Sequence, residues 1–164
     1  MNILLVSTLK RKGRYTVNTA ELIETAVIEN DLARECILHG VGTIGRGRRP
    51  FATALITSTE GTRKRGSASF YYTPLGMLVC VAVGGLEDER GVYTLSLATW
   101  ENGGYREIPC NIPPLYARGG YAWCSALTGK LTPSEVRNKT VLLKLLDGHN
   151  SEIEAMGTVR GCER

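Results

Sequence analysis

The sequence predicts an all-β sandwich or barrel preceded by a helical extension. Three observations carry this prediction. Apolar residues recur with a period near 3.6 before residue 40 and with a period of two after Pro50. Turn residues are closely spaced after Pro50 with no helical pattern between them, which is typical of antiparallel Greek-key folds. The chain has 164 residues, of which 43% are hydrophobic and 22% charged, so it can bury a core without disulfides or metals.

Residues 1–49 form the predicted N-terminal extension. Asn18-Thr19-Ala20-Glu21 begins like a capping box, and apolar residues follow at helical spacing until Gly40. The pattern predicts a helix over residues 19–39, followed by a basic linker rich in glycine over residues 40–49. The apolar stripe of such a helix must be covered by the barrel, by a second copy of the chain or by a partner protein. The sequence leaves these three options open.

Residues 50–164 form the predicted β domain. Strands are expected where apolar and polar residues alternate, or where a short apolar run lies between turn residues. An irregular loop over residues 99–120 is expected to connect the two sheets of a Greek key. The expected strands cover residues 51–56, 66–73, 77–83, 91–98, 122–127, 140–145 and 151–159.

The net charge of +4 is concentrated in three short clusters, at residues 10–14, 46–49 and 63–65. A nucleic-acid-binding domain would place stacking aromatic side chains beside such clusters, and here the aromatic residues lie elsewhere in the sequence. The pattern therefore favours solvated loops, and we expect no nucleic-acid partner. A basic nucleic-acid-binding module that uses residues 10–14 and 46–65 is kept as an alternative.

The start of the chain and its apolar runs bear on its location. No apolar run approaches the roughly 20 residues that a membrane span needs. The basic residues at 10–14 follow the short apolar start, whereas in a secretory signal they would precede it. We therefore expect a cytoplasmic protein with no membrane partner.

Several segments after Pro50 resemble, in order and spacing, the copper/zinc superoxide dismutase family, and in particular its short bacterial members. The resemblance covers residues 50–164 and implies the family's eight-stranded Greek-key barrel. Because family members often pair through barrel faces, it also makes a homodimer an option. The segments that carry it are Pro74–Leu86, Gly91–Ala98, Asn111–Tyr116 (NIPPLY), Gly119–Trp123 (GGYAW), and Lys130–Val136 (KLTPSEV) leading into Lys139–Leu143 (KTVLL).

The resemblance also implies where the family's metal ligands would lie. The two copper-binding histidines of its H-x-H motif correspond to Ser96 and Ala98, and the last copper-binding histidine corresponds to Lys144. A zinc-binding histidine corresponds to Ile108, and the zinc-binding aspartate corresponds to Asn111. A methyl group, a hydroxyl and an ammonium cannot replace three imidazoles around a redox metal.

We therefore expect no metal, no cofactor and no catalytic residue, because the chain has only two histidines, His39 and His149. The preferred interpretation is a pseudoenzyme, a superoxide-dismutase-like domain kept as a binding or structural module. The alternative from the same family is a working metalloenzyme with substitute ligands, completed by a partner chain.

Two further pairs of residues are candidates for a specific role, one pair for a disulfide and the other for base stacking. By the resemblance, Cys162 corresponds to the cysteine that closes the family's disulfide, and Cys110 is then its candidate partner; two free thiols are the equal alternative. Tyr121 and Trp123 could form a stacking platform, but in a sandwich the sequence favours them as packing residues that alternate with Ala122.

Overall fold

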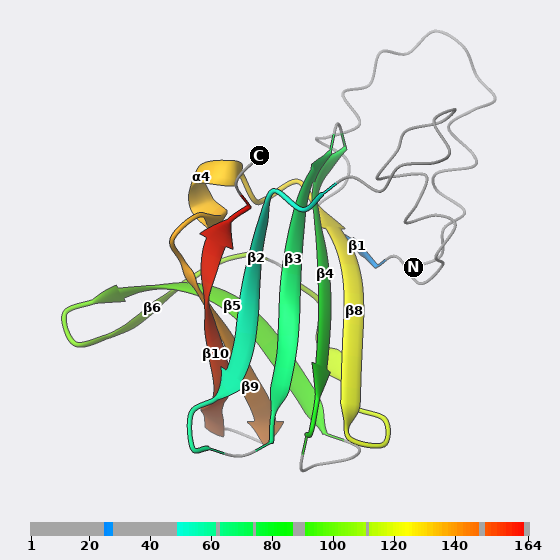
Figure 1. Ribbon diagram of the computed structural model, residues 1–164, viewed down its shortest axis with the longest axis vertical. Coiled ribbons are helices and arrows are strands. Elements are labelled where there is room, and N and C mark those ends of the chain that lie inside the picture. The colour runs from blue at the N-terminus through cyan, green and yellow to red at the C-terminus, as the bar shows by residue number, and fades with distance from the viewer. Residues whose placement is uncertain are drawn as a thin grey trace, which may run out of the picture.

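The computed structural model describes residues 25–27, 49–61, 63–73, 75–86, 91–110, 112–147 and 150–162. Within these residues the chain forms one antiparallel sheet that curls into a half-barrel (Figure 1). The all-β class predicted from the alternating pattern is therefore confirmed, and each of the strands expected after Pro50 is present. No helix among the described residues is long and apolar enough to span a bilayer.

The strands follow one another across the sheet in an order that differs from their order in the sequence. The spatial order is β1-β8-β4-β3-β2-β10-β9-β5-β6, with β7 paired to β5. Their bounds are Thr25–Val27 (β1), Ala52–Ser58 (β2), Arg65–Thr73 (β3), Gly76–Gly84 (β4), Val92–Glu101 (β5), Gly104–Ile108 (β6), Leu115–Tyr116 (β7), Tyr121–Thr128 (β8), Thr140–Asp147 (β9) and Asn150–Gly161 (β10).

The connections build two layers. Strands β2, β3 and β4 follow one another as neighbours, whereas β8 returns beside β4 and β10 returns beside β2. Strands β9 and β5 pass behind β2, β3 and β4 (Figure 1).

The hydrophobic core lies between these layers. Phe70 of β3 and Tyr93 of β5 are among its largest buried side chains. On β4 and β8 the inward side chains are complementary in size, because Val81 and Val83 lie opposite Cys124 and Ala122. Burial raises the pKa of Cys124 to about 11, so this residue stays a thiol and packs as a small apolar side chain.

The predicted helix over residues 19–39 is wrong at Thr25–Val27, which form strand β1. This strand pairs with Ala126–Thr128 at one end of β8. The edge of β8 has backbone N–H and C=O groups that can pair with another strand, and no local sequence pattern reveals this. Pairing with them outweighs the local preference of residues 25–27 for a helix. The remainder of the predicted helix and most of the linker lie outside the described residues.

The irregular loop predicted over residues 99–120 is also corrected. Strand β5 continues to Glu101, and a tight turn at Asn102-Gly103 leads into β6, where both turn residues have positive φ. The hairpin projects beyond the body of the sheet (Figure 1). The edge-to-face contact of Trp100 with Tyr105, with ring centroids 4.7 Å apart, stabilises it.

The segment between β8 and β9 contains one short helix, α4 (Pro133–Val136). The Glu135 carboxylate accepts hydrogen bonds from the backbone N–H of Thr132 at 2.8 Å and from its hydroxyl at 2.7 Å. These bonds lower the pKa of Glu135 and fix the start of the helix. The buried side chain of Val136 then anchors the turn to the core.

Candidate functional site

Two of the positions that the resemblance equates with copper ligands lie close together. Ser96 of β5 and Lys144 of β9 alternate with the buried Leu95, Leu97 and Leu143, so both side chains are on the outer face of the half-barrel. The strands are neighbours, and the residue opposite Lys144 is Thr94, two positions from Ser96. The sheet therefore brings these two residues together on one face.

The β5–β6 hairpin covers this outer face. Glu107 of β6 forms an ion pair with Lys144 of β9, whose side chain is only 13% exposed. Further along β6, the Tyr105 hydroxyl lies 3.2 Å from the Met156 sulfur of β10. The chain's own hairpin thus closes over the surface around Ser96.

The Lys144–Glu107 pair governs the electrostatics of this cluster. The hydrogen bond from Lys144 is the main cause that lowers the pKa of Glu107 below 4.5, against a smaller opposing effect of burial. The Ser96 hydroxyl contributes in the same direction, yet its buried oxygen has no hydrogen bond of good geometry among the described residues. We therefore treat Ser96 as a neighbour of the carboxylate and not as its bonded donor, because donor geometry decides hydrogen bonding.

The remaining positions implied by the resemblance differ in place. Ala98 lies two residues after Ser96 on the same face of β5, opposite Glu107 of β6, and is fully buried there, whereas Ile108 packs against the core. Asn111 lies outside the described residues. Cys110 is buried and Cys162 is exposed near Thr53, and both are free thiols in this structure. The Cys110–Cys162 bridge stays a prediction.

These side chains do not fit a copper or zinc ion. An ammonium cannot donate an electron pair to a metal, and the positive charge of Lys144 opposes a second cation beside it. Its counter-charge, Glu107, is already engaged in the ion pair. Across the described part of the chain, no three His, Cys, Asp or Glu side chains gather in a group that could hold a metal ion.

The pair predicts a specific pH dependence of stability. Because the pKa of Glu107 is lowered by folding, its contribution is present above its unfolded value and is lost as the pH falls through the folded value. We expect Glu107→Gln to destabilise the protein at pH 7 and to destabilise it less at about pH 2, because the carboxylate is protonated as the pH falls through its lowered pKa. Urea unfolding at both pH values measures this, with Glu101→Gln on the same hairpin as the control. An equal loss at both values would contradict it.

The structure corrects the packing role predicted for Tyr121 and Trp123. Their side chains are 68% and 62% exposed, while the residues that alternate with them on β8, Ala122 and Cys124, face the core. The sequence shows that small and aromatic residues alternate on β8, but the small residues Ala122 and Cys124 face the core and the aromatic residues face outward. The large valines on the neighbouring strand β4 leave no room in the core for aromatic rings.

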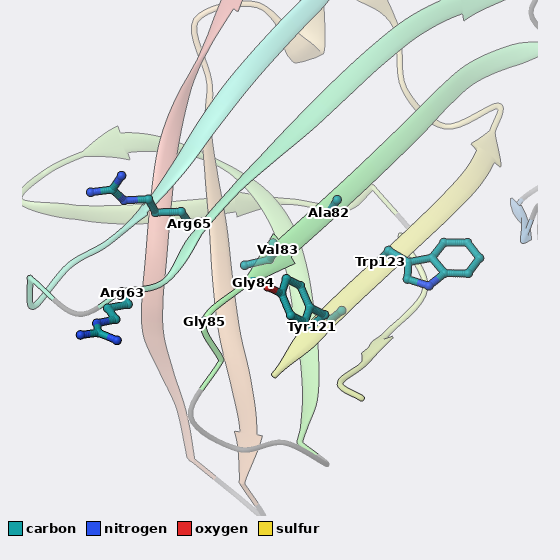
Figure 2. Close-up of a pocket in the computed structure, with 9 residues that line it drawn as sticks. Arg63, Arg65, Ala82, Val83, Gly84, Gly85, Tyr121 and Trp123 are labelled. Atoms are coloured by element: carbon teal, nitrogen blue, oxygen red, sulfur yellow. The ribbon is translucent and has the colours of Figure 1, made fainter. Parts of the chain in front are cut away.

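Tyr121 and Trp123 border an open hollow of about 590 Å³ on the outer face of β3, β4 and β8. Figure 2 shows the arginine side chains on one side of the Tyr121 ring and the Trp123 indole on the other. In the strand register, Arg65 and Tyr121 flank Gly84, so two interstrand spacings, roughly 10 Å, separate their backbones. The residues that line the hollow are Arg63, Arg65, Ala82, Val83, Gly84, Gly85, Tyr121, Ala122 and Trp123.

Gly84 sets the position of the Tyr121 ring. A Cβ atom added at Gly84 would lie 2.6 Å from the ring carbon Cε1, so the ring lies directly over the glycine. Such aromatic cover of a strand glycine holds the ring against the sheet. The ring is thereby oriented with its other face open to solvent.

This hollow is not predictable from the sequence because its two halves are far apart in the chain. The sequence predicts a solvated loop for Arg63 and Arg65 and a packing role for Tyr121 and Trp123. The pairing of β3 with β4, and of β4 with β8, places them on one surface. The only local signal was the same-face spacing of Arg63 with Arg65 and of Tyr121 with Trp123.

Comparisons with known proteins give no family for this chain. No protein-family model matches it, and no curated protein is significantly similar to it in sequence.

Proposed function

We propose that residues 50–164 form a superoxide-dismutase-like domain that binds no catalytic metal and acts as a binding or structural module. The observation that carries the proposal is the ion pair between Lys144 and Glu107 on the outer face of β5 and β9. It lies where the resemblance implies metal ligands, and it already satisfies both charges there. The positive charge of the Lys144 ammonium repels a divalent cation, so such a site is unfavourable for metal binding.

The strand order supports the fold part of the proposal. The return of β10 beside β2 and of β9 beside β5 agrees with the Greek-key barrel that the resemblance implies. The motif residues also fall in suitable elements, because the Lys130–Val136 segment ends in helix α4 and leads into β9. A homodimer and a protein partner for the N-terminal extension stay proposals.

Metal content after expression in medium supplemented with copper and zinc tests the proposal. We expect the purified full chain to hold neither metal in stoichiometric amount and to show no dismutation of superoxide. Elemental analysis and a superoxide consumption assay measure the two properties. One equivalent of copper together with dismutase activity would reject the proposal in favour of the metalloenzyme with substitute ligands.

A designed variant provides the matched control. Ser96→His combined with Lys144→His places two imidazoles beside the Glu107 carboxylate, which is a ligand set that zinc accepts. We expect this variant to retain zinc, since it removes the ammonium and supplies nitrogen donors. Retained zinc would show that the absence of metal in the unaltered chain is due to its side chains and not to the metal supply.

A further inference from the structure

We infer that the hollow between β3 and β8 binds single-stranded nucleic acid. The inference names a partner for the proposed binding module, but it rests on a different face of the sheet from the Lys144–Glu107 pair. The absence of aromatic side chains near the basic clusters argued against such a partner in the sequence. The structure removes that objection for Arg63 and Arg65, because Tyr121 and Trp123 share their hollow.

The hollow combines a surface for base stacking with cationic side chains for phosphate binding, which are the two contacts that a nucleotide can make. Tyr121 and Trp123 are two residues apart on β8, and each presents an exposed ring on which a base can stack. Arg63 and Arg65 lie on the opposite side, and their side chains extend away from the Tyr121 ring (Figure 2). Guanidinium groups bind phosphate oxygens as charged hydrogen-bond donors, so there they would hold the backbone of a strand whose bases stack on the rings. Stacking accepts any base, so the surface should bind without strong sequence preference.

The floor and the charge of the hollow favour this partner over a folded protein. Its floor carries the small exposed residue Ala82, and the Tyr121 ring covers Gly84, so a flat base can approach the sheet at Ala82 and stack on that ring. Both charged residues of its lining are arginines, and no acidic residue belongs to that lining. Glu87–Glu89, which follow in the sequence, lie outside the described residues. Strand β1 pairs with the far end of β8, at Ala126–Thr128.

The salt dependence of the affinity distinguishes the phosphate contacts of the arginines from base stacking on the rings. Each phosphate that an arginine neutralises releases counterions, so affinity falls with salt with a slope of about 0.7 for each contact on a single strand. Loss of both arginines should therefore reduce the slope by about 1.4. Loss of a stacking ring should lower affinity about equally at every salt concentration.

The test uses the full chain and a fluorescent oligothymidylate of about twelve nucleotides, within the usual site sizes for single-strand binding. Anisotropy titrations at low and rising salt give the affinity of each variant. We expect Trp123→Ala to weaken binding roughly ten-fold. The double variant Arg63→Gln with Arg65→Gln should weaken binding and flatten the salt dependence. Trp123→Phe, which keeps a ring, should bind nearly as the unaltered chain does.

Matched controls exist on the β5–β6 hairpin. Trp100 and Arg106 are exposed residues of the same types outside the hollow, so Trp100→Ala and Arg106→Gln should leave binding unchanged. In the Trp100→Phe background, Trp123 is the only tryptophan, and we expect the oligonucleotide to quench its fluorescence. This readout separates the hollow from charge effects of residues 10–14.

Three results would overturn the inference. They are no binding at low salt, equal weakening by the hairpin controls, or binding of polyglutamate as tight as that of the oligonucleotide, which would identify a surface for acidic proteins. These outcomes are independent of the metal test. Bound copper would reject the proposed function but would not bear on nucleic-acid binding by the hollow. Absence of oligonucleotide binding would reject the inference about the hollow but would not change the metal result.

Discussion

Replacement of Phe70 by alanine is expected to lower the free energy of unfolding by about 4 kcal/mol. The Phe70 side chain is fully buried in the core, and β3 holds it between its neighbours β2 and β4. Truncation removes its apolar contacts and leaves a cavity, because tightly paired strands on both sides restrict collapse. Urea or thermal unfolding monitored by circular dichroism measures the change.

Tyr72, two residues further along β3, is the matched control. It is an aromatic residue of similar size on the same strand, but its side chain is 61% exposed. Tyr72→Ala should therefore change the free energy of unfolding by less than about 1 kcal/mol. A loss for Phe70→Ala no greater than that for Tyr72→Ala would contradict the position of the core between the two layers.

Removal of Glu154 by substitution with alanine is expected to destabilise the protein by about 3 kcal/mol. Glu154 forms an ion pair with Lys64, and the two side chains are 19% and 7% exposed. The pair joins the start of β3 to β10 at a β-bulge, where the register shifts between Ile153 and Ala155. Without the carboxylate, the mostly buried Lys64 ammonium loses its ion pair with Glu154, and removal of one partner of a buried pair is costly.

The hairpin provides the comparison for this variant as well. Glu101 pairs with Arg106, but these side chains are 40% and 74% exposed, so Glu101→Ala should change stability by less than about 1 kcal/mol. Removal of both Lys64 and Glu154 should be less harmful than removal of Glu154 alone, because no buried charge is left behind. Denaturant unfolding of the three variants measures the order. Equal losses for Glu154→Ala and Glu101→Ala would show that the bulge does not depend on the pair.

Local alternation of apolar and polar residues is enough to predict most strands after Pro50, although not β6 and β7, because a strand with one buried face needs apolar side chains at every second position. Such a pattern is written in neighbouring residues, as in β5, where the buried Tyr93, Leu95 and Leu97 alternate with Thr94 and Ser96. No contact with the remainder of the chain is needed to recognise it.

Strand pairing specifies which side chains meet, and no local pattern reveals it. The partner of Lys144 is Glu107, 37 residues away in the chain, and Arg65 shares a surface with Tyr121 only because β4 lies between their strands. Which of two alternating sets faces inward was likewise settled by size, since the core beside the valines of β4 accepts Ala122 and excludes Trp123. Thr25–Val27 form a strand because their backbone groups pair with the edge of β8. Local periodicity thus specifies the elements, whereas strand pairing and the volume left by neighbours specify the sites.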